Sequence, residues 1–173
     1  IRKTSLMLIR HNFIFENYKE AFRTAQLSKS YKDGAISSAF IPQFYFYDSL
    51  VRLALYSSET KLTQRKSLKQ VARNQKKMKK WAFHCPENFS HKYHLVQAEK
   101  ARVSGKEYTA KKEYTLAVKL ARKHQYLNEE ALGLELTAKF WFGLDEKDFA
   151  AMYMSKACAA YQTWGAYAKV DHI

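Results

Sequence analysis

Four residues in the stretch WAFHCPENFSHKYH, residues 81–94, have side chains that bind metal ions: His84, Cys85, His91 and His94. A structural zinc site takes its ligands in close pairs, such as two cysteines with two to four residues between them or two histidines with three to five. His91 and His94 have only two residues between them, and Cys85 has no second cysteine nearby. This incomplete spacing argues against a metal site, so we predict no metal and no cofactor.

The same stretch contains the signals of a helix start. Pro86 fits the first turn of a helix, where its missing N–H costs nothing, and Glu87 suits the positive end of the helix dipole. We therefore interpret Cys85-Pro86 as a corner between two helices. Four aromatic residues are expected to pack this corner: Trp81, Phe83, Phe89 and Tyr93.

Acid–base and phosphoryl-transfer chemistry find little support in the sequence. Acidic residues gather in two places, at Glu129, Glu130 and Glu135 and at Asp145 and Glu146. The first group follows Asn128, as at a capped helix start, and the second suits a turn. No base and nucleophile stand at motif spacing, and the glycine-rich phosphate loops, the kinase motifs and the G-x-S-x-G elbow are all missing. We predict a chain without a catalytic site of its own.

The composition indicates one folded, all-α unit. The 173 residues are 47% hydrophobic and 15% aromatic, and only five glycines and two prolines interrupt them. Long segments with few turn residues favour helices over strands. The expected organisation is a single helical domain over residues 1–173, and the first and last residues suggest a fragment of a larger protein.

The two cysteines and the apolar pattern bear on location. Cys85 and Cys158 lie far apart among helix-forming residues, which fits a reducing compartment and favours a cytoplasmic location. Arg52 interrupts the most apolar stretch, so no run reaches the ~20 residues of a membrane span. The basic N-terminus lacks the apolar stretch and cleavage site of a signal peptide.

The second half of the chain aligns with itself when the sequence is shifted so that Ala98 falls on Ala138. We call this the repeat shift. Small residues then meet small ones, and one large residue meets another, in the pairs Ala98/Ala138, Ala110/Ala150, Ala117/Ala157 and Tyr114/Met154. Spacing of i, i+4, i+7 places such residues on one helix face, where small side chains let a neighbouring helix approach. Gly105 and Asp145 precede the two alanine-bearing helices. The expected hairpins pair 87–104 with 107–123 and 128–142 with 147–163.

The first half shows a weaker version of the same design. Tyr18, Ala21, Ala25 and Ser28 form a small-residue face on a helix expected at 17–30, after a helix at 3–15. A further hairpin pairs 39–57 with 61–83. About eight helices in four antiparallel hairpins therefore fill the chain. In the run FYFYD, residues 44–48, we expect core side chains.

The G-x-x-Y in SGKEY and the alanine–aromatic–alanine face behind it resemble the tetratricopeptide repeat (TPR). The unit is longer than the ~34 residues of that repeat and lacks its terminal proline. The resemblance implies hairpins stacked in a right-handed arc, with the first helix of each hairpin lining a concave groove. It places eight residues on that interaction face: Lys92, Leu95, Glu99, Arg102, Leu132, Glu135, Lys139 and Phe142. Adjoining domains of the parent protein, more than a foreign peptide, are the expected users of this face. The alternative is a groove that the chain's own neighbouring helices fill.

Longer strings carry a second resemblance, which spans about residues 15–170. They are FYFYDSLVRLALY, NQKKMKKWAFHCPENFSHKYHLVQAEKAR, YLNEEALGLELTAKFW and YQTWGAYAKV. They are similar to the TPR-like helical region of multidomain signalling proteins, in which a serine/threonine-kinase-like domain and an AAA-type ATPase precede the helices and sensor histidine-kinase modules follow. The resemblance implies a scaffold or interaction segment that binds protein.

The chain is strongly basic, with 30 basic and 16 acidic residues and a net charge of +14. At 100° per residue, a cationic stripe and an apolar side separate on the helix expected at 61–83. The stripe consists of Arg65, Lys69, Arg73, Lys76 and Lys80, and the apolar side of Leu68, Val71, Ala72, Met78 and Ala82. A solvated outer face is the simpler interpretation. The alternative is a patch for an acidic partner domain, an anionic membrane or nucleic acid, the last disfavoured because no aromatics interleave with the stripe.

Overall fold

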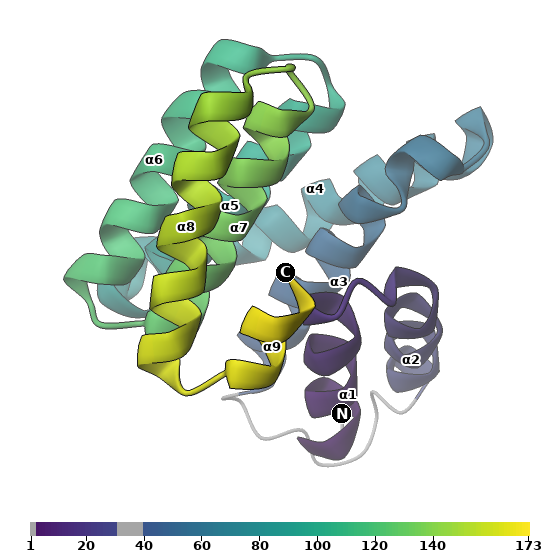
Figure 1. Ribbon diagram of the computed structural model, residues 1–173. Helices are drawn as coiled ribbons and strands as arrows, with labels where there is room; N and C mark the ends of the chain where they lie inside the picture. Colours follow the sequence, from purple (N-terminus) through teal and green to yellow (C-terminus); the bar gives the residue numbers. More distant parts are fainter. Residues whose placement is uncertain (1–2, 31–39) are drawn as a thin grey trace. The chain divides into compact units, whose positions relative to one another are not determined.

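The computed structural model describes residues 3–30 and 40–173, and in these residues it contains helices and no strand. The helices are α1 (Lys3–Ile14), α2 (Tyr18–Ser30), α3 (Phe40–Ala54), α4 (Lys61–His84), α5 (Pro86–Val103), α6 (Glu107–Lys123), α7 (Leu127–Phe142), α8 (Lys147–Trp164) and α9 (Tyr167–His172), with a short 3-10 helix, η1, at Tyr56–Ser58. The predicted all-α class is confirmed (Figure 1).

The chain divides into two compact units, Ile1–Trp81 and Ala82–Ile173, and each is described by itself. The expected single domain over residues 1–173 stays a prediction. Among the described residues, each helix is too short or too polar to span a lipid bilayer.

Unit 1 contains the α1–α2 hairpin and the aromatic helix α3. The turn between α1 and α2 passes through Glu16, whose φ is +61°. Ala21 and Ala25 on α2 have no exposed surface, which confirms the small-residue face expected there. The side chains of Phe44, Tyr45, Phe46 and Tyr47 on α3 are also buried, as predicted for a core segment.

Polar side chains connect α3 to α4. The buried Asp48 carboxylate accepts hydrogen bonds from Arg52 Nε on α3, at 3.1 Å, and from Asn74 Nδ2 on α4, at 2.8 Å. Lys77 Nζ on α4 donates to the Tyr45 hydroxyl at 2.9 Å. Later residues of α4 thus meet earlier residues of α3, so the contacts run in the antiparallel sense, but the two helices lack the close backbone packing of a hairpin such as α1–α2.

Unit 2 repeats its backbone geometry at a constant interval. Gly105, Gln125, Asp145 and Gly165 all have a positive φ, between +60° and +81°, and each follows the end of a helix. The residue after each turn donates its N–H to the carbonyl five residues earlier: Lys106 to Ala101, Tyr126 to Ala121, Glu146 to Trp141 and Ala166 to Tyr161. This left-handed closure satisfies carbonyls at a helix end. Two helices with their turns make one hairpin, and each hairpin follows the last by the repeat shift found in the sequence.

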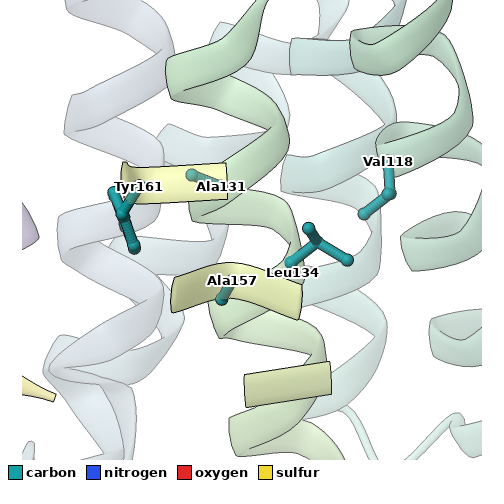
Figure 2. Close-up of a cluster of buried hydrophobic side chains, with 5 residues drawn as sticks. All are labelled: Val118, Ala131, Leu134, Ala157 and Tyr161. Atoms are coloured by element: carbon teal, nitrogen blue, oxygen red, sulfur yellow. The ribbon is translucent and has the colours of Figure 1, made fainter. Parts of the chain in front are cut away.

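The core of unit 2 lies where small residues allow helices to approach. A cluster of Val118, Ala131, Leu134, Ala157 and Tyr161 joins α6, α7 and α8 (Figure 2). Ala110 and Tyr114 on α6 and Ala157 on α8 have no exposed surface. A Cβ atom added at Gly133 of α7 would lie 3.1 Å from Val118 Cγ2, which shows how closely α7 approaches α6.

Three details of the sequence interpretation differ from the structure. Phe83 is 81% exposed, so the expectation that it packs the corner is wrong. Ala72 on α4 is exposed instead of lying on a buried apolar side. The short helix α9 was not expected, because so few residues cannot show a helical period. The corner itself is confirmed: α4 ends at His84, and Pro86 occupies the first turn of α5.

The small-residue faces predict a large effect of a buried charge. Ala157→Glu or Ala110→Glu should lower the free energy of unfolding by at least about 3 kcal/mol, because the carboxylate would enter a helix interface without a partner. Urea denaturation followed by circular dichroism measures the change. Ala159→Glu is the matched control on α8, since Ala159 is exposed, and it should shift stability by less than about 0.5 kcal/mol. Wild-type stability of Ala157→Glu would contradict the packing.

Candidate functional site

The structure does not bring the four residues considered as metal ligands together. His84 is exposed at the end of α4, Cys85 is half-buried before α5, and His91 is buried. His94 instead pairs through Nδ1 with Glu113 Oε2 on α6, at 2.7 Å. Among the described residues, no three side chains of the metal-binding types gather at one point.

His91 belongs to a buried polar cluster around Lys92. Lys92 Nζ donates to His91 Nε2 at 2.8 Å, lies 3.4 Å from Glu129 Oε1 on α7, and sits 4.4 Å above the Tyr126 ring. Because the lysine occupies Nε2, the ring proton is placed on Nδ1. Within the described part of the chain, Nδ1 of His91 and Oε2 of Glu129 are buried without a hydrogen-bond partner.

The charges of this cluster set the protonation of its members. Burial and the neighbouring Lys92 and His124 lower the pKa of His91 from 6.5 to about 3, so the ring is neutral at pH 7. Burial and the carboxylates of Glu129 and Glu87 raise the pKa of Tyr126, whose hydroxyl donates to Asn88 Oδ1 at 2.6 Å. The cluster links α5 to α7 through the Lys92–Glu129 ion pair. None of its residues lines the two surface hollows of unit 2.

The eight residues expected on a concave face divide by exposure. Five side chains are buried: Lys92, Leu95, Glu99, Leu132 and Glu135. Arg102 and Lys139 each keep about a third of their side chain exposed, at 35% and 33%, and Phe142 is 69% exposed. Only the last three offer surface to another molecule, and the interaction face stays a prediction.

Two of the buried residues, Glu99 and Glu135, are the acceptors that close the two hairpins of unit 2. Glu99 on α5 accepts hydrogen bonds from Arg102 Nη2, at 2.7 Å, and from the Tyr114 hydroxyl on α6. Burial and the adjacent Glu99 carboxylate raise the pKa of Tyr114 well above its ordinary value of 10, so this hydroxyl stays a donor. Burial opposes the charge of Arg102, yet the Glu99 carboxylate raises the pKa of the guanidinium further.

Glu135 performs the same task for three helices. It accepts from Lys139 Nζ of its own helix α7 at 2.6 Å, from the Tyr161 hydroxyl of α8 at 2.6 Å, and from Lys169 Nζ of α9 at 2.9 Å. Burial alone would favour the neutral acid. The two ammonium groups and the hydroxyl outweigh burial and hold the pKa of Glu135 below its ordinary value of 4.5.

The remaining carboxylates considered for acid–base chemistry are placed differently. Glu129 and Glu130 lie in the first turn of α7, where they form ion pairs with Lys92, at 3.4 Å, and with Arg122 of α6, at 2.8 Å. Asp145 and Glu146 form the turn before α8, as expected. The sequence did not reveal these ion pairs, since the members of each pair lie on different helices and no periodic signal links them.

An open apolar cleft lies on the α7–α8 hairpin, with a volume of about 520 Å³. Its lining consists of Ala138, Lys139, Phe142, Lys147, Ala150, Ala151 and Met154. We call this surface the end face. Next to the lining residues in the sequence of α8, Phe149 is 47% exposed and Met152 39%.

The cationic stripe is exposed as predicted. All five of its residues, Arg65, Lys69, Arg73, Lys76 and Lys80, face solvent, while Val71 and Met78 on the other side of α4 are buried. The whole helix carries nine lysines and arginines and no acidic residue. No carboxylate among the described residues neutralises the five members of the stripe.

Comparison of the chain with protein-family models, with curated proteins and with solved structures finds no significant match. The case for a function therefore depends on the surfaces described above.

His91 makes folding sensitive to pH. Below about pH 6.5 the unfolded chain binds a proton at His91 that the folded chain refuses until the pH approaches 3, so stability falls as the pH falls through this range. The expected loss is about 2 kcal/mol between pH 7 and pH 5. His91→Gln should remove this part of the slope in urea denaturation curves, whereas His84→Gln, at an exposed position, should keep it. Equal slopes in the wild type and His91→Gln would contradict burial of a neutral ring.

Proposed function

We propose that this chain is a non-catalytic helical-repeat module that makes protein–protein contacts, and that its end face receives a helix from a partner protein or a neighbouring domain. The observation that carries the proposal is the apolar cleft on α7–α8. Exposure of apolar surface to water is unfavourable, and large exposed apolar patches mark interaction sites. TPR-like stacking in a right-handed arc belongs to the same proposal.

The repeat geometry supports a helix as the occupant. On the preceding hairpin, the positions one repeat shift earlier are covered by the second half of α7: the Phe140 ring lies 5.3 Å from Tyr114, and Lys111 Nζ lies 4.7 Å from the Trp141 ring. Tyr114 is fully buried there, but its counterpart Met154 is only half-buried. The end face is thus the surface on which, one hairpin earlier, a helix packs.

Helix α9 packs against the α7–α8 hairpin outside the end face. Val170 of α9 and Ala166 just before it pack against the core cluster, and Lys169 pairs with Glu135 at 2.9 Å. The repeat shift matches α9 with the start of α7, Leu127–Leu132. By the same repeat shift, the cleft occupies the position that the second half of a helix like α7 would cover. This position favours helix-in-groove recognition.

The wider context comes from the sequence strings given above. Their resemblance to the TPR-like region of multidomain signalling proteins with kinase and ATPase domains supports a scaffold role inside a larger cytoplasmic protein. The sequence contains none of the catalytic motifs considered above, which is consistent with that role. Adjoining domains of such a parent are the partners we propose first.

Site-specific photo-crosslinking tests the proposal. A benzophenone amino acid at position 142 of the full chain should give one discrete adduct in the cells that produce it, mapped by mass spectrometry to a helical segment of the partner. The same group at position 108 is the control, because Tyr108 on α6 is 82% exposed and lies outside the cleft. Only background adducts are expected there.

A second variant separates docking from random contact. Ala151→Glu places a carboxylate in the cleft at an exposed position, so it should remove the adduct at position 142 while the melting temperature stays within about 2 °C of wild type. An adduct that survives Ala151→Glu, or equal adducts at positions 108 and 142, would exclude the end face as the docking surface.

The charge of α4 favours a second candidate function, the binding of an anionic surface. Nine positive charges on one helix of 24 residues, with five of them on an exposed stripe, attract polyanions without specifying a sequence. A solvated face remains the simpler interpretation, because the stripe contains no aromatic side chain that stacks on bases.

Changing all five stripe residues to Gln distinguishes the two interpretations. A solvated face predicts unchanged helix content, an unchanged or higher melting temperature because like charges are removed, and the loss of only weak binding to duplex DNA at low salt. Fluorescence anisotropy with labelled DNA measures the binding. Tight, sequence-dependent binding by the wild type at physiological salt, abolished in the variant, would favour the nucleic-acid alternative.

A further inference from the structure

A second hollow of unit 2 lies between α6 and α8, away from the end face. Its volume is about 360 Å³, and its floor includes Val118 of α6 and Leu134 of α7, both members of the cluster in Figure 2. Tyr153 of α8 contributes an aromatic wall. This size lies at the lower end of the range for small-molecule sites. We call this hollow the α6–α8 groove.

The rim of the groove is cationic on both sides. Lys119, Arg122 and Lys123 come from α6 and Lys156 comes from α8, and no acidic residue contributes to the lining. Arg122 is already paired with Glu130 at 2.8 Å. Within the part of the chain that the structure describes, Lys119, Lys123 and Lys156 pair with no carboxylate, and Lys156 Nζ lies 5.4 Å from the Tyr153 ring centre.

Three unneutralised ammonium groups around one concave surface repel one another, and a bound anion relieves this repulsion. A single negative charge would leave most of it, whereas a phosphate monoester carries a charge of about −1.5 to −2 at pH 7. The aromatic wall adds a second requirement, because a small inorganic ion would leave the half-buried Tyr153 ring in contact with water. The preferred ligand is therefore an anion with an apolar body.

We propose that the α6–α8 groove binds a small organic phosphate, whose body packs on the Tyr153 ring above the buried Val118 and Leu134 and whose phosphoryl group meets Lys119, Lys123 and Lys156. This site is independent of the proposed docking of a helix. The end face uses Ala150, Ala151 and Met154 of α8, whereas the groove uses Tyr153 and Lys156 of the same helix.

The test titrates the full chain with phenyl phosphate and follows the ¹H–¹⁵N NMR spectrum. Phenyl phosphate should bind at least tenfold more tightly than inorganic phosphate, which lacks the apolar body, and than benzoate, which has a single charge. The largest amide shifts should occur on α6 and α8 around residues 115–119 and 153–156. Because the cationic stripe lies on α4, shifts confined to α4 would overturn the proposal.

Variants identify the residues responsible. Lys119→Gln combined with Lys156→Gln should weaken phenyl phosphate binding at least tenfold. Lys112→Gln is the control, since Lys112 is an exposed lysine of α6 outside the groove, and it should change affinity less than twofold. Equal losses in both variants would show nonspecific attraction and overturn the proposal. Tighter binding of poly-glutamate than of phenyl phosphate at the same amides would also overturn it, in favour of an acidic polypeptide.

Discussion

The arrangement of unit 2 depends on the buried carboxylate of Glu135. One oxygen accepts from ammonium groups of α7 and α9, and the other accepts from the Tyr161 hydroxyl of α8. A buried carboxylate is costly unless charged partners and hydrogen bonds satisfy it, so this set of partners fixes the positions of three helices at once. Glu99 joins α5 and α6 in the same way, through Arg102 and Tyr114.

These carboxylates also decide which surfaces remain for partners. The inner carboxylates of α7 are paired within unit 2: Glu129 with Lys92 of α5, and Glu135 with Lys139 of α7 and Lys169 of α9. Two surfaces of unit 2 stay accessible: the end face on the α7–α8 hairpin and the groove between α6 and α8. The end face offers apolar area, and the α6–α8 groove offers positive charge over an apolar floor. We therefore propose two different kinds of ligand for these two surfaces of α8.

Much of the fold could be predicted from the sequence because its signals are local or periodic. The helix expected at 107–123 is observed at Glu107–Lys123, and the repeat shift correctly paired Ala110 with Ala150 and Ala117 with Ala157. The buried charged residues of the candidate site could not be predicted in this way. Residues such as Lys92 and Glu135 have the spacing of a solvent-facing helical surface, and nothing in the spacing reveals that a partner on a distant helix buries them. Phe83 shows the converse, because this aromatic residue lies among residues expected to pack together and is nevertheless exposed.

Titration of the Glu135 side chain in the full chain tests the junction of α7, α8 and α9 most directly. Carboxyl ¹³C NMR of glutamate-labelled protein, with the signal assigned through Glu135→Gln, gives its pKa. We predict a midpoint below the ordinary 4.5, because Lys139, Tyr161 and Lys169 stabilise the ionised form against the effect of burial. A midpoint at or above 4.5 would show that the three helices do not meet at this carboxylate.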